Sequence, residues 1–252
     1  MKIASWNVNS LKVRLEHVQN WLAENKPDVL CLQETKTEDT NFPLQAIEQA
    51  GYHVIFSGQK TYNGVAIISK TEATDIQYGL PNFEDAQKRL IAATINNIRV
   101  VCVYIPNGES IDSEKYKYKL SWLAALQSWL KDELQRYPKL VLLGDYNIAP
   151  EDRDVHDPAL WVDKVLVSDP ERAAFQALQK LGLRDAFRLF EQPEKSFSWW
   201  DYRMMGFRRN HGMRIDHILI SQPVTCAASS IDKIPRKLER PSDHTPVWAD
   251  IA

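Results

Sequence analysis

Polar side chains of two chemical types follow the apolar segments of this sequence. Asn7 comes after the first segment, Glu34 after the second, and Asp145 and Asn147 after an apolar run near the middle of the chain. Carboxylate and amide oxygens are ligands that suit Mg²⁺, and a carboxylate can also take a proton from an attacking water. This pattern favours metal-assisted hydrolysis of an anionic ester, with Asp145 taking the proton and Asn147 orienting the water.

Histidine and tyrosine side chains extend this set. His244 could hydrogen-bond a non-bridging phosphate oxygen, and a carboxylate such as Asp216 could hold its imidazole in one tautomer. Tyr104 could donate to the phosphate or assist the leaving group. The pattern offers no soft ligand, which disfavours zinc and favours Mg²⁺, with Mn²⁺ as a substitute. Each residue alone is more typical of a turn or a solvated surface, but their shared place at strand ends favours a site.

Alternating strands and helices must bring these side chains together. Apolar residues at helical spacing indicate helices, and short apolar runs bounded by turn residues indicate strands. Strands are expected at 2–6, 29–33, 53–57, 64–69, 89–95, 99–105, 140–143, 215–221 and 245–251, and helices at 11–25, 42–51, 116–136 and 170–181. Because several strand pairs are joined as hairpins, the pattern predicts a mixed-sheet α/β sandwich with its site in the loops at the strand ends.

Bulk composition excludes some classes of protein. The chain has 252 residues, a formal net charge of −2 and three widely spaced cysteines. Nucleic-acid binding would therefore depend on a local basic patch and not on the net charge. The cysteines lack zinc or redox spacing and indicate buried free thiols in a reducing compartment, and no apolar run has membrane-spanning length. We expect a single domain over residues 1–252, and a cytoplasmic monomer that associates with DNA and not with a membrane.

Seven segments of the chain resemble the exonuclease III family of the endonuclease/exonuclease/phosphatase superfamily. In family order they are WNVNS (6–10), LQETK (32–36), NGVAIISK (63–70), YIPNG (104–108), LLGDYNIAP (142–150), GMRIDHIL (212–219) and PSDHTPVWA (241–249). The resemblance implies a four-layer α/β sandwich with two facing mixed β-sheets flanked by helices, as in DNase I-like proteins.

The resemblance also implies a place at the reaction centre for the polar residues at the strand ends. These places are Asn7 and Glu34 at Mg²⁺, Asp145 and Asn147 at the attacking water, Tyr104 at the phosphate, and Asp216 paired with His244. Asp243 is implied to support the metal or its waters. One departure concerns Asn9, because some relatives have aspartate there, which puts a charged supporting role at this position in doubt.

Residues 203–214 form the densest basic segment and mix arginine with methionine and phenylalanine. Arginine neutralises phosphates, while apolar side chains can wedge into a duplex. The expected DNA contacts are Arg89, Asn107, Phe207, Arg208 and Arg214. The alternative is a solvated basic loop with a buried Phe207. A second cluster, Lys115, Lys117 and Lys119, is as typical of a solvated helical face as of a phosphate contact.

Family resemblance places three large apolar residues, Trp199, Met213 and Ile215, in a pocket for a base-less sugar. Core packing is the alternative for them, above all for Trp199. The loop 152–167 should lie over the same region. Its His156 could narrow the pocket and disfavour an extrahelical abasic sugar.

These observations predict a Mg²⁺-dependent phosphodiesterase that acts on double-stranded DNA with abasic sites, nicks or 3′ ends. The expected activities are 5′ incision at abasic sites, 3′-end cleaning including 3′-phosphatase action, and 3′→5′ exonuclease action. One alternative is a phosphatase of the same superfamily acting on a small phosphorylated molecule or a lipid head group, which would lack the basic-aromatic insertion. Another is a non-catalytic relative that only binds damaged DNA, which the complete catalytic set disfavours.

Overall fold

The computed structural model describes residues 1–81 and 83–252, and over these residues the chain forms two six-stranded β-sheets. The strands of the first sheet lie in the order β11 (Cys226–Ile231), β12 (Val247–Ile251), β1 (Lys2–Asn7), β2 (Val29–Gln33), β4 (Val65–Ser69) and β3 (His53–Ser57). Those of the second lie in the order β5 (Thr74–Tyr78), β6 (Leu90–Ile95), β7 (Ile98–Tyr104), β8 (Leu140–Asp145), β10 (Asp216–Ser221) and β9 (Leu183–Asp185). Each sheet is mixed, because β1 and β2 pair in parallel in the first sheet and β7 and β8 in the second, whereas their neighbours pair antiparallel.

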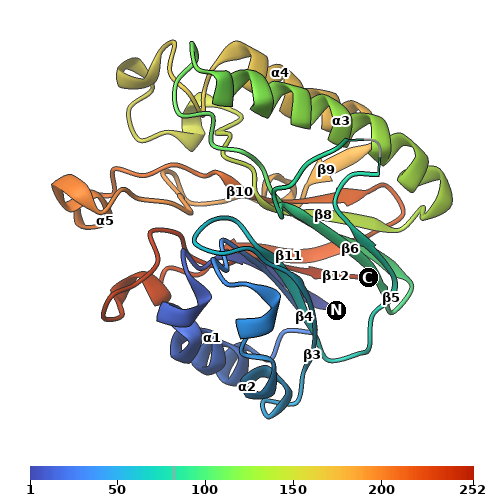
Figure 1. The fold of residues 1–252 in the computed structure, drawn as a ribbon. Helices are drawn as coiled ribbons and strands as arrows, with labels where there is room; N and C mark the ends of the chain where they lie inside the picture. The colour runs from blue at the N-terminus through green and yellow to red at the C-terminus, as the bar shows by residue number, and fades with distance from the viewer. Residues whose placement is uncertain (82) are drawn as a thin grey trace.

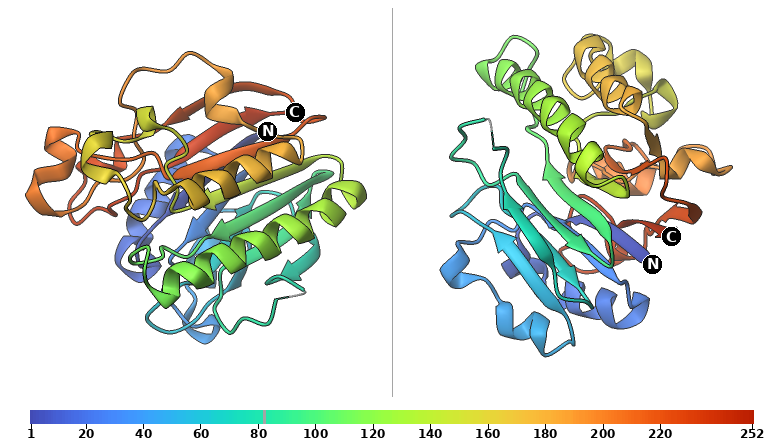
Figure 2. Two further views of the ribbon diagram at one scale, coloured as in Figure 1. Left: turned by 90° about the horizontal axis from the view of Figure 1, so that it is seen from above. Right: turned by 90° about the vertical axis from the view of Figure 1, so that its right-hand side faces the viewer.

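Helices cover the outer face of each sheet. The helices α1 (Leu11–Asn25) and α2 (Leu44–Glu48) lie on the outside of the first sheet, and α3 (Glu114–Arg136) and α4 (Asp169–Lys180) lie on the outside of the second (Figures 1 and 2). The short α5 (Gly206–Arg209) lies at the end of a long extension (Figure 1). Short 3₁₀ turns are found at Asp39–Asn41, Asp152–Asp154, Pro158–Trp161, Ala186–Leu189, Arg203–Met205 and Pro235–Lys237. The expected four-layer α/β sandwich is confirmed.

Apolar side chains fill the space between the two sheets and the space beneath the helices. In β2, Val29 and Cys31 face the other sheet, whereas Leu30 and Leu32 face α1. Successive side chains of a strand point to opposite faces, and both faces of this strand are covered. This explains why its sequence is continuously apolar. Among the described residues, no helix is both long and apolar enough to cross a bilayer.

Strand register brings the polar residues to one edge of the sandwich. Asn7 at the end of β1 pairs with Gln33, the last residue of the parallel strand β2. In the second sheet, Asp145 lies beside Tyr104 on one side and Asp216 on the other. The carboxyl ends of β1, β2, β7 and β8 and the start of β10 therefore meet at the same end of the two sheets.

Sequence patterns missed three strands, β5, β9 and β11. All three lie at sheet edges, and the side chains of β5 and β11 are largely exposed or half-buried. Edge strands with polar residues lack the apolar runs by which a strand is recognised. The helix expected at 42–51 is shorter, because only Leu44–Glu48 is α-helical. The cysteines are free, as expected, but Cys226 is only half-buried.

Candidate active site

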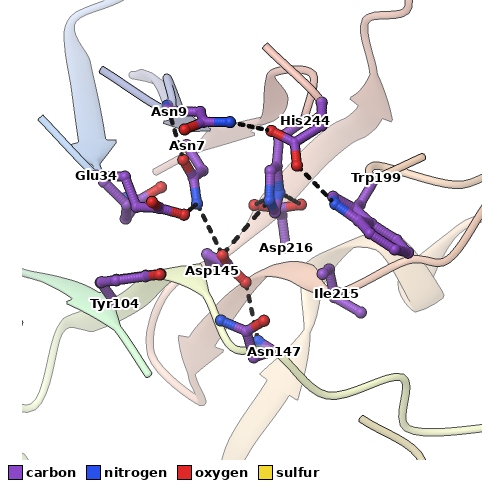
Figure 3. A network of polar contacts seen from close by, with 12 residues as sticks. Asn7, Asn9, Glu34, Tyr104, Asp145, Asn147, Trp199, Ile215, Asp216 and His244 are labelled. Atoms are coloured by element: carbon purple, nitrogen blue, oxygen red, sulfur yellow. Dashed lines mark hydrogen bonds and ion pairs between the residues drawn. The ribbon is translucent and has the colours of Figure 1, made fainter. Parts of the chain in front are cut away.

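Two carboxylates from different sheets meet on the amide of Asn7. Its Nδ2 donates to Oε1 of Glu34 and to Oδ2 of Asp145, both at 2.9 Å (Figure 3). Its Oδ1 accepts the backbone N–H of Asn9 at 2.9 Å. Asn7 therefore presents its nitrogen to both carboxylates and positions them, and its expected place beside the metal stays a prediction.

Tight turns follow the strands β2 and β8 and carry the side chains of Glu34 and Asn147. Glu34 and Asn147 both have a left-handed backbone, with φ of 50° and 51°. Asn147 tolerates this conformation better than most residues with a Cβ. Its backbone N–H donates to Oδ1 of Asp145 at 2.9 Å, so the turn returns to the carboxylate that ends β8. Lys36 forms an ion pair with Glu34 at 2.8 Å.

A histidine–carboxylate pair lies across from Glu34. His244 Nδ1 lies 2.9 Å from Oδ2 of Asp216, and its Nε2 lies 3.7 Å from Oδ2 of Asp145. The buried hydroxyl of Ser198 donates to the same Asp216 oxygen at 2.6 Å. The ring is therefore fixed between two carboxylates, with one nitrogen directed to each. Sequence reasoning missed Ser198, although it directly precedes Trp199, which the resemblance had placed in the sugar pocket.

Burial and charge set the protonation states at this centre. Burial opposes a charged imidazole, but Asp216 and Asp145 together raise the pKa of His244 to about 10. Burial raises the pKa of Asp145 to about 7; His244 opposes this rise and Asp216 adds to it. Burial, followed by the charges of Glu34 and Asp145, raises the pKa of Tyr104 well above its usual value. The phenol therefore stays protonated at neutral pH and can donate a hydrogen bond.

The donor set fits a hard divalent cation. Glu34, Asp145 and His244 each bring one potential ligand atom within 4.8 Å of the others. Burial, with a smaller contribution from Asp216, raises the pKa of Asp145, and a cation at this point would favour the charged carboxylate. Carboxylate oxygens suit Mg²⁺, which keeps several waters and binds few protein groups. Asp243 stands apart from this group, because its carboxylate accepts from Asn9 at 2.9 Å and from the indole of Trp199 at 3.0 Å.

Tyr104 and Arg89 form the other wall of the centre. The hydroxyl of Tyr104 points toward Asp145 (Figure 3), and the half-buried guanidinium of Arg89 stacks over the Tyr104 ring at 4.7 Å. Asn107 is exposed, and its Nδ2 donates to Oδ1 of Asn147 at 2.9 Å. Arg89, Tyr104, Asn107 and Tyr118 line a cavity of about 750 Å³. A cation, a phenol and two amides so placed can bind a phosphodiester.

Sequence comparison places this arrangement in a known family. The profile of the endonuclease/exonuclease/phosphatase family matches residues 4–244. Exodeoxyribonuclease III of Haemophilus influenzae is 39% identical to the chain over 265 aligned residues, which cover 99% of each protein. The chain belongs to the endonuclease/exonuclease/phosphatase family. The expected likeness to its exonuclease III branch is confirmed.

Solved structures of family members share the whole fold. The 3′ phosphatase NExo from Neisseria, bound to a product DNA hairpin, superposes with a TM-score of 0.98 at 49% identity, covering 100% of this chain and 99% of that one. An AP endonuclease from Archaeoglobus fulgidus superposes with a TM-score of 0.96 at 43% identity, covering 99% and 98%. Both likenesses extend over the two sheets and the loops that carry the centre.

Trp199 lines a second cavity, of about 580 Å³. Trp199 and Tyr104 lie on opposite sides of Asp145 (Figure 3). His156, on the loop after β8, and His211 also line this cavity, and their rings stack at 4.9 Å with an interplanar angle of 13°. Burial lowers the pKa of His156. The exposed side chain of Met204 and the Arg203 side chain complete one rim. The loop 152–167 therefore lies over Trp199, as expected.

Arg214 is buried, and not exposed as the predicted DNA contact requires. It is 1% exposed, and its guanidinium donates to Asp154 at 2.7 and 3.2 Å and to Asp185 at 2.8 Å. Arg188 also binds Asp154. The two arginines and the two aspartates thus neutralise each other inside the protein. Arg208 remains exposed on α5 and available to a phosphate.

The apolar members of the expected DNA surface also pack within the protein. Phe207 is half-buried, and its ring lies edge-on against Trp200 at 5.0 Å and beneath the guanidinium of Arg236 at 4.9 Å. These contacts hold the ring within the protein, so it is not free to insert between base pairs. Met213 and Ile215 are 0% and 1% exposed and belong to an apolar cluster beneath Trp199. They pack in the same cluster as Trp199 and do not line the cavity that Trp199 lines.

Lys119 likewise differs from the basic cluster to which the sequence assigned it. Lys115 and Lys117 are exposed and pair with Glu109 and Glu114, whereas Lys119 is fully buried. Helical spacing could have predicted that Lys119 lies on the buried side of α3. Its buried acidic partner was not, because that partner lies on α4.

Proposed function

We propose that this protein is a Mg²⁺-dependent phosphodiesterase that acts on damaged or terminal sites in double-stranded DNA. The observation that carries the proposal is the buried Asp145–His244–Asp216 array facing Glu34 at one end of the two sheets. Carboxylates that can hold a divalent cation beside an imidazolium suit hydrolysis of an anionic ester, because the cation and the imidazolium neutralise the charge of the phosphate. Relatives named for exodeoxyribonuclease III, 3′ phosphatase and AP endonuclease activities support DNA as the substrate.

Each side chain has a distinct part in the proposed reaction. Asp145 takes the proton of the attacking water, and its raised pKa suits it to that step near neutral pH. Asn147 holds the water through Oδ1, which retains a free lone pair beside the Asn107 hydrogen bond. His244, kept protonated by Asp216, donates to a non-bridging phosphate oxygen, and Tyr104 donates from the other side. Mg²⁺ held by Glu34 would supply charge neutralisation at the phosphate.

We further infer that 3′-end processing dominates over incision at abasic sites. The rings of His156 and His211 stack on each other in the wall of the cavity that Trp199 also lines. They reduce the room in this cavity for an extrahelical sugar. Replacing His156 with Gly removes that ring, and the ratio of abasic incision to 3′-phosphate removal should rise about tenfold or more, as expected for relief of a steric exclusion. An unchanged ratio would exclude His156 from this role. Lys164, on the same rim but facing Trp161, supplies the control as Lys164→Gly.

Three labelled duplexes test the main proposal. One carries an internal abasic analogue, one a 3′-phosphate at a nick, and one a plain recessed 3′ end; each is incubated with Mg²⁺ or with EDTA. Mg²⁺-dependent cutting by the wild type and not by Asp145→Asn supports the phosphodiesterase. Binding without cutting would favour a non-catalytic DNA-binding relative. Neither binding nor cutting, with release of phosphate from a small phosphate ester, would favour a phosphatase.

A further inference from the structure

A buried ion pair lies directly behind the turn that carries Asn147. Lys119 on α3 and Glu171 on α4 are both 0% exposed, and their side chains are in direct contact. The other hydrogens of the Lys119 ammonium are donated to the backbone carbonyl of Asn147 at 2.6 Å and to that of Asn107 at 3.1 Å. All three donors of the ammonium therefore have acceptors, and two of them belong to the reaction centre.

Glu171 is held just as completely. It is the third residue of α4, and Oε2 accepts from the backbone N–H and the hydroxyl of Ser168 at 3.1 and 2.6 Å, which closes the start of the helix. Its Oε1 also accepts from the N–H of Leu166 at 3.0 Å. The hydroxyl of Tyr116 lies 2.6 Å from the Ser168 hydroxyl. The carboxylate therefore cannot follow Lys119 if the loop moves, and it fixes the ammonium in place.

This pair determines where the Asn147 amide lies. The Asn147 side chain donates to the carbonyl of Ile105 at 3.0 Å and accepts from Asn107, so the loops after β7 and β8 form one unit. Lys119 binds a backbone carbonyl of each loop. The carbonyl of Asn147 accepts from the ammonium at 2.6 Å, so this contact fixes the peptide group that follows Asn147. No apolar residue could hold both carbonyls and the helix start together.

We propose that Lys119 is a positioning residue for this reaction, anchored by Glu171, and that it acts through Asn147 without touching the substrate. The proposal rests on the proposed function for its kinetic consequence. A buried ion pair typically adds little stability compared with an apolar pair of similar volume. Its place directly behind the reaction centre points to a geometric role, because small displacements of a group that orients the nucleophile reduce turnover strongly.

Variants that keep the fold can separate positioning from stability. Lys119→Met alone leaves Glu171 charged and unpaired, so the test uses the double variant Lys119→Met/Glu171→Gln, which removes both charges and keeps the acceptor for Ser168. We expect kcat for 3′-phosphate removal to fall about 10²-fold with KM changed less than threefold. The matched control is Arg99→Met/Glu133→Gln, which removes another buried ion pair that lies away from the site and should leave kcat unchanged.

A cycle with Asn147→Ala tests the path of the effect. If Lys119 acts through Asn147, the triple variant should have the same kcat as Asn147→Ala alone; multiplied losses would overturn the proposal. Wild-type kcat in a folded double variant would also overturn it. Amide hydrogen exchange of the protein without substrate gives a readout independent of activity, with faster exchange in 105–109 and 146–150 expected in the double variant only. If the wild type cuts no DNA, the proposed function fails, while unchanged exchange in these segments refutes the positioning role separately.

Discussion

Replacing Arg214 with Met should destabilise the fold and leave DNA affinity unchanged. The guanidinium satisfies Asp154, which is 0% exposed, and Asp185, which is 5% exposed. Removing one partner of a buried charge pair costs about 3–5 kcal/mol, because the remaining charges stay buried and unpaired. Arg188 still contacts Asp154 in the variant, so the lower end of that range, about 3 kcal/mol, is expected.

Urea denaturation at pH 7 measures this change, with the exposed Arg208→Met as the control. The control should alter the free energy of unfolding by less than about 0.5 kcal/mol and weaken DNA binding modestly. Burial opposes ionisation of Asp154, but Arg214 and then Arg188 hold the pKa of this carboxyl below its usual value. Without Arg214 this pKa rises, so the deficit of the variant should shrink as the pH falls toward 4. A stable Arg214→Met protein with weakened DNA binding would refute the assignment of Arg214 to the interior.

Three other outcomes are expected. Asp145→Asn should fold and bind DNA normally but lose about 10²- to 10⁴-fold in turnover, measured on the 3′-phosphate duplex; near-normal turnover would remove Asp145 from the base role. Glu34→Gln should raise the Mg²⁺ concentration needed for half-maximal rate, whereas an unchanged Mg²⁺ titration would assign the metal elsewhere. Burial and Arg214 lower the pKa of His217 to about 4. Because its unfolded pKa is about 6.5, acidification from pH 7 to 5 should cost about 2 kcal/mol of stability through this group. His217→Gln should lose that part of the pH dependence in urea denaturation, and an identical slope in both proteins would contradict it.

Much of the site could be predicted from the sequence because strand ends are local features. Asn7, Glu34 and Asp145 each lie within two residues of the end of an apolar run, so the side chains could be placed at one edge of the sandwich before any contact was known. The helix 11–25 and the strand 29–33 were predicted with their observed bounds. The roles of these residues were inferred from the family resemblance as well. The residue types alone do not show which side chain binds a metal and which one orients a neighbouring side chain. The structure adds that the Asn7 nitrogen donates to Glu34 and Asp145, which the sequence pattern did not predict.

Tertiary structure alone decided which charged residues face water. Arg214 lies in the most basic segment of the chain, and its acidic partners are 60 and 29 positions away in sequence. Lys119 lies among exposed lysines, and its partner Glu171 is 52 positions away. Sequence spacing determines the side of a strand or helix on which a side chain lies, because backbone geometry is local and periodic. Whether a buried charge is tolerated there depends on the distant groups that replace its water, and only the folded chain brings those groups into contact.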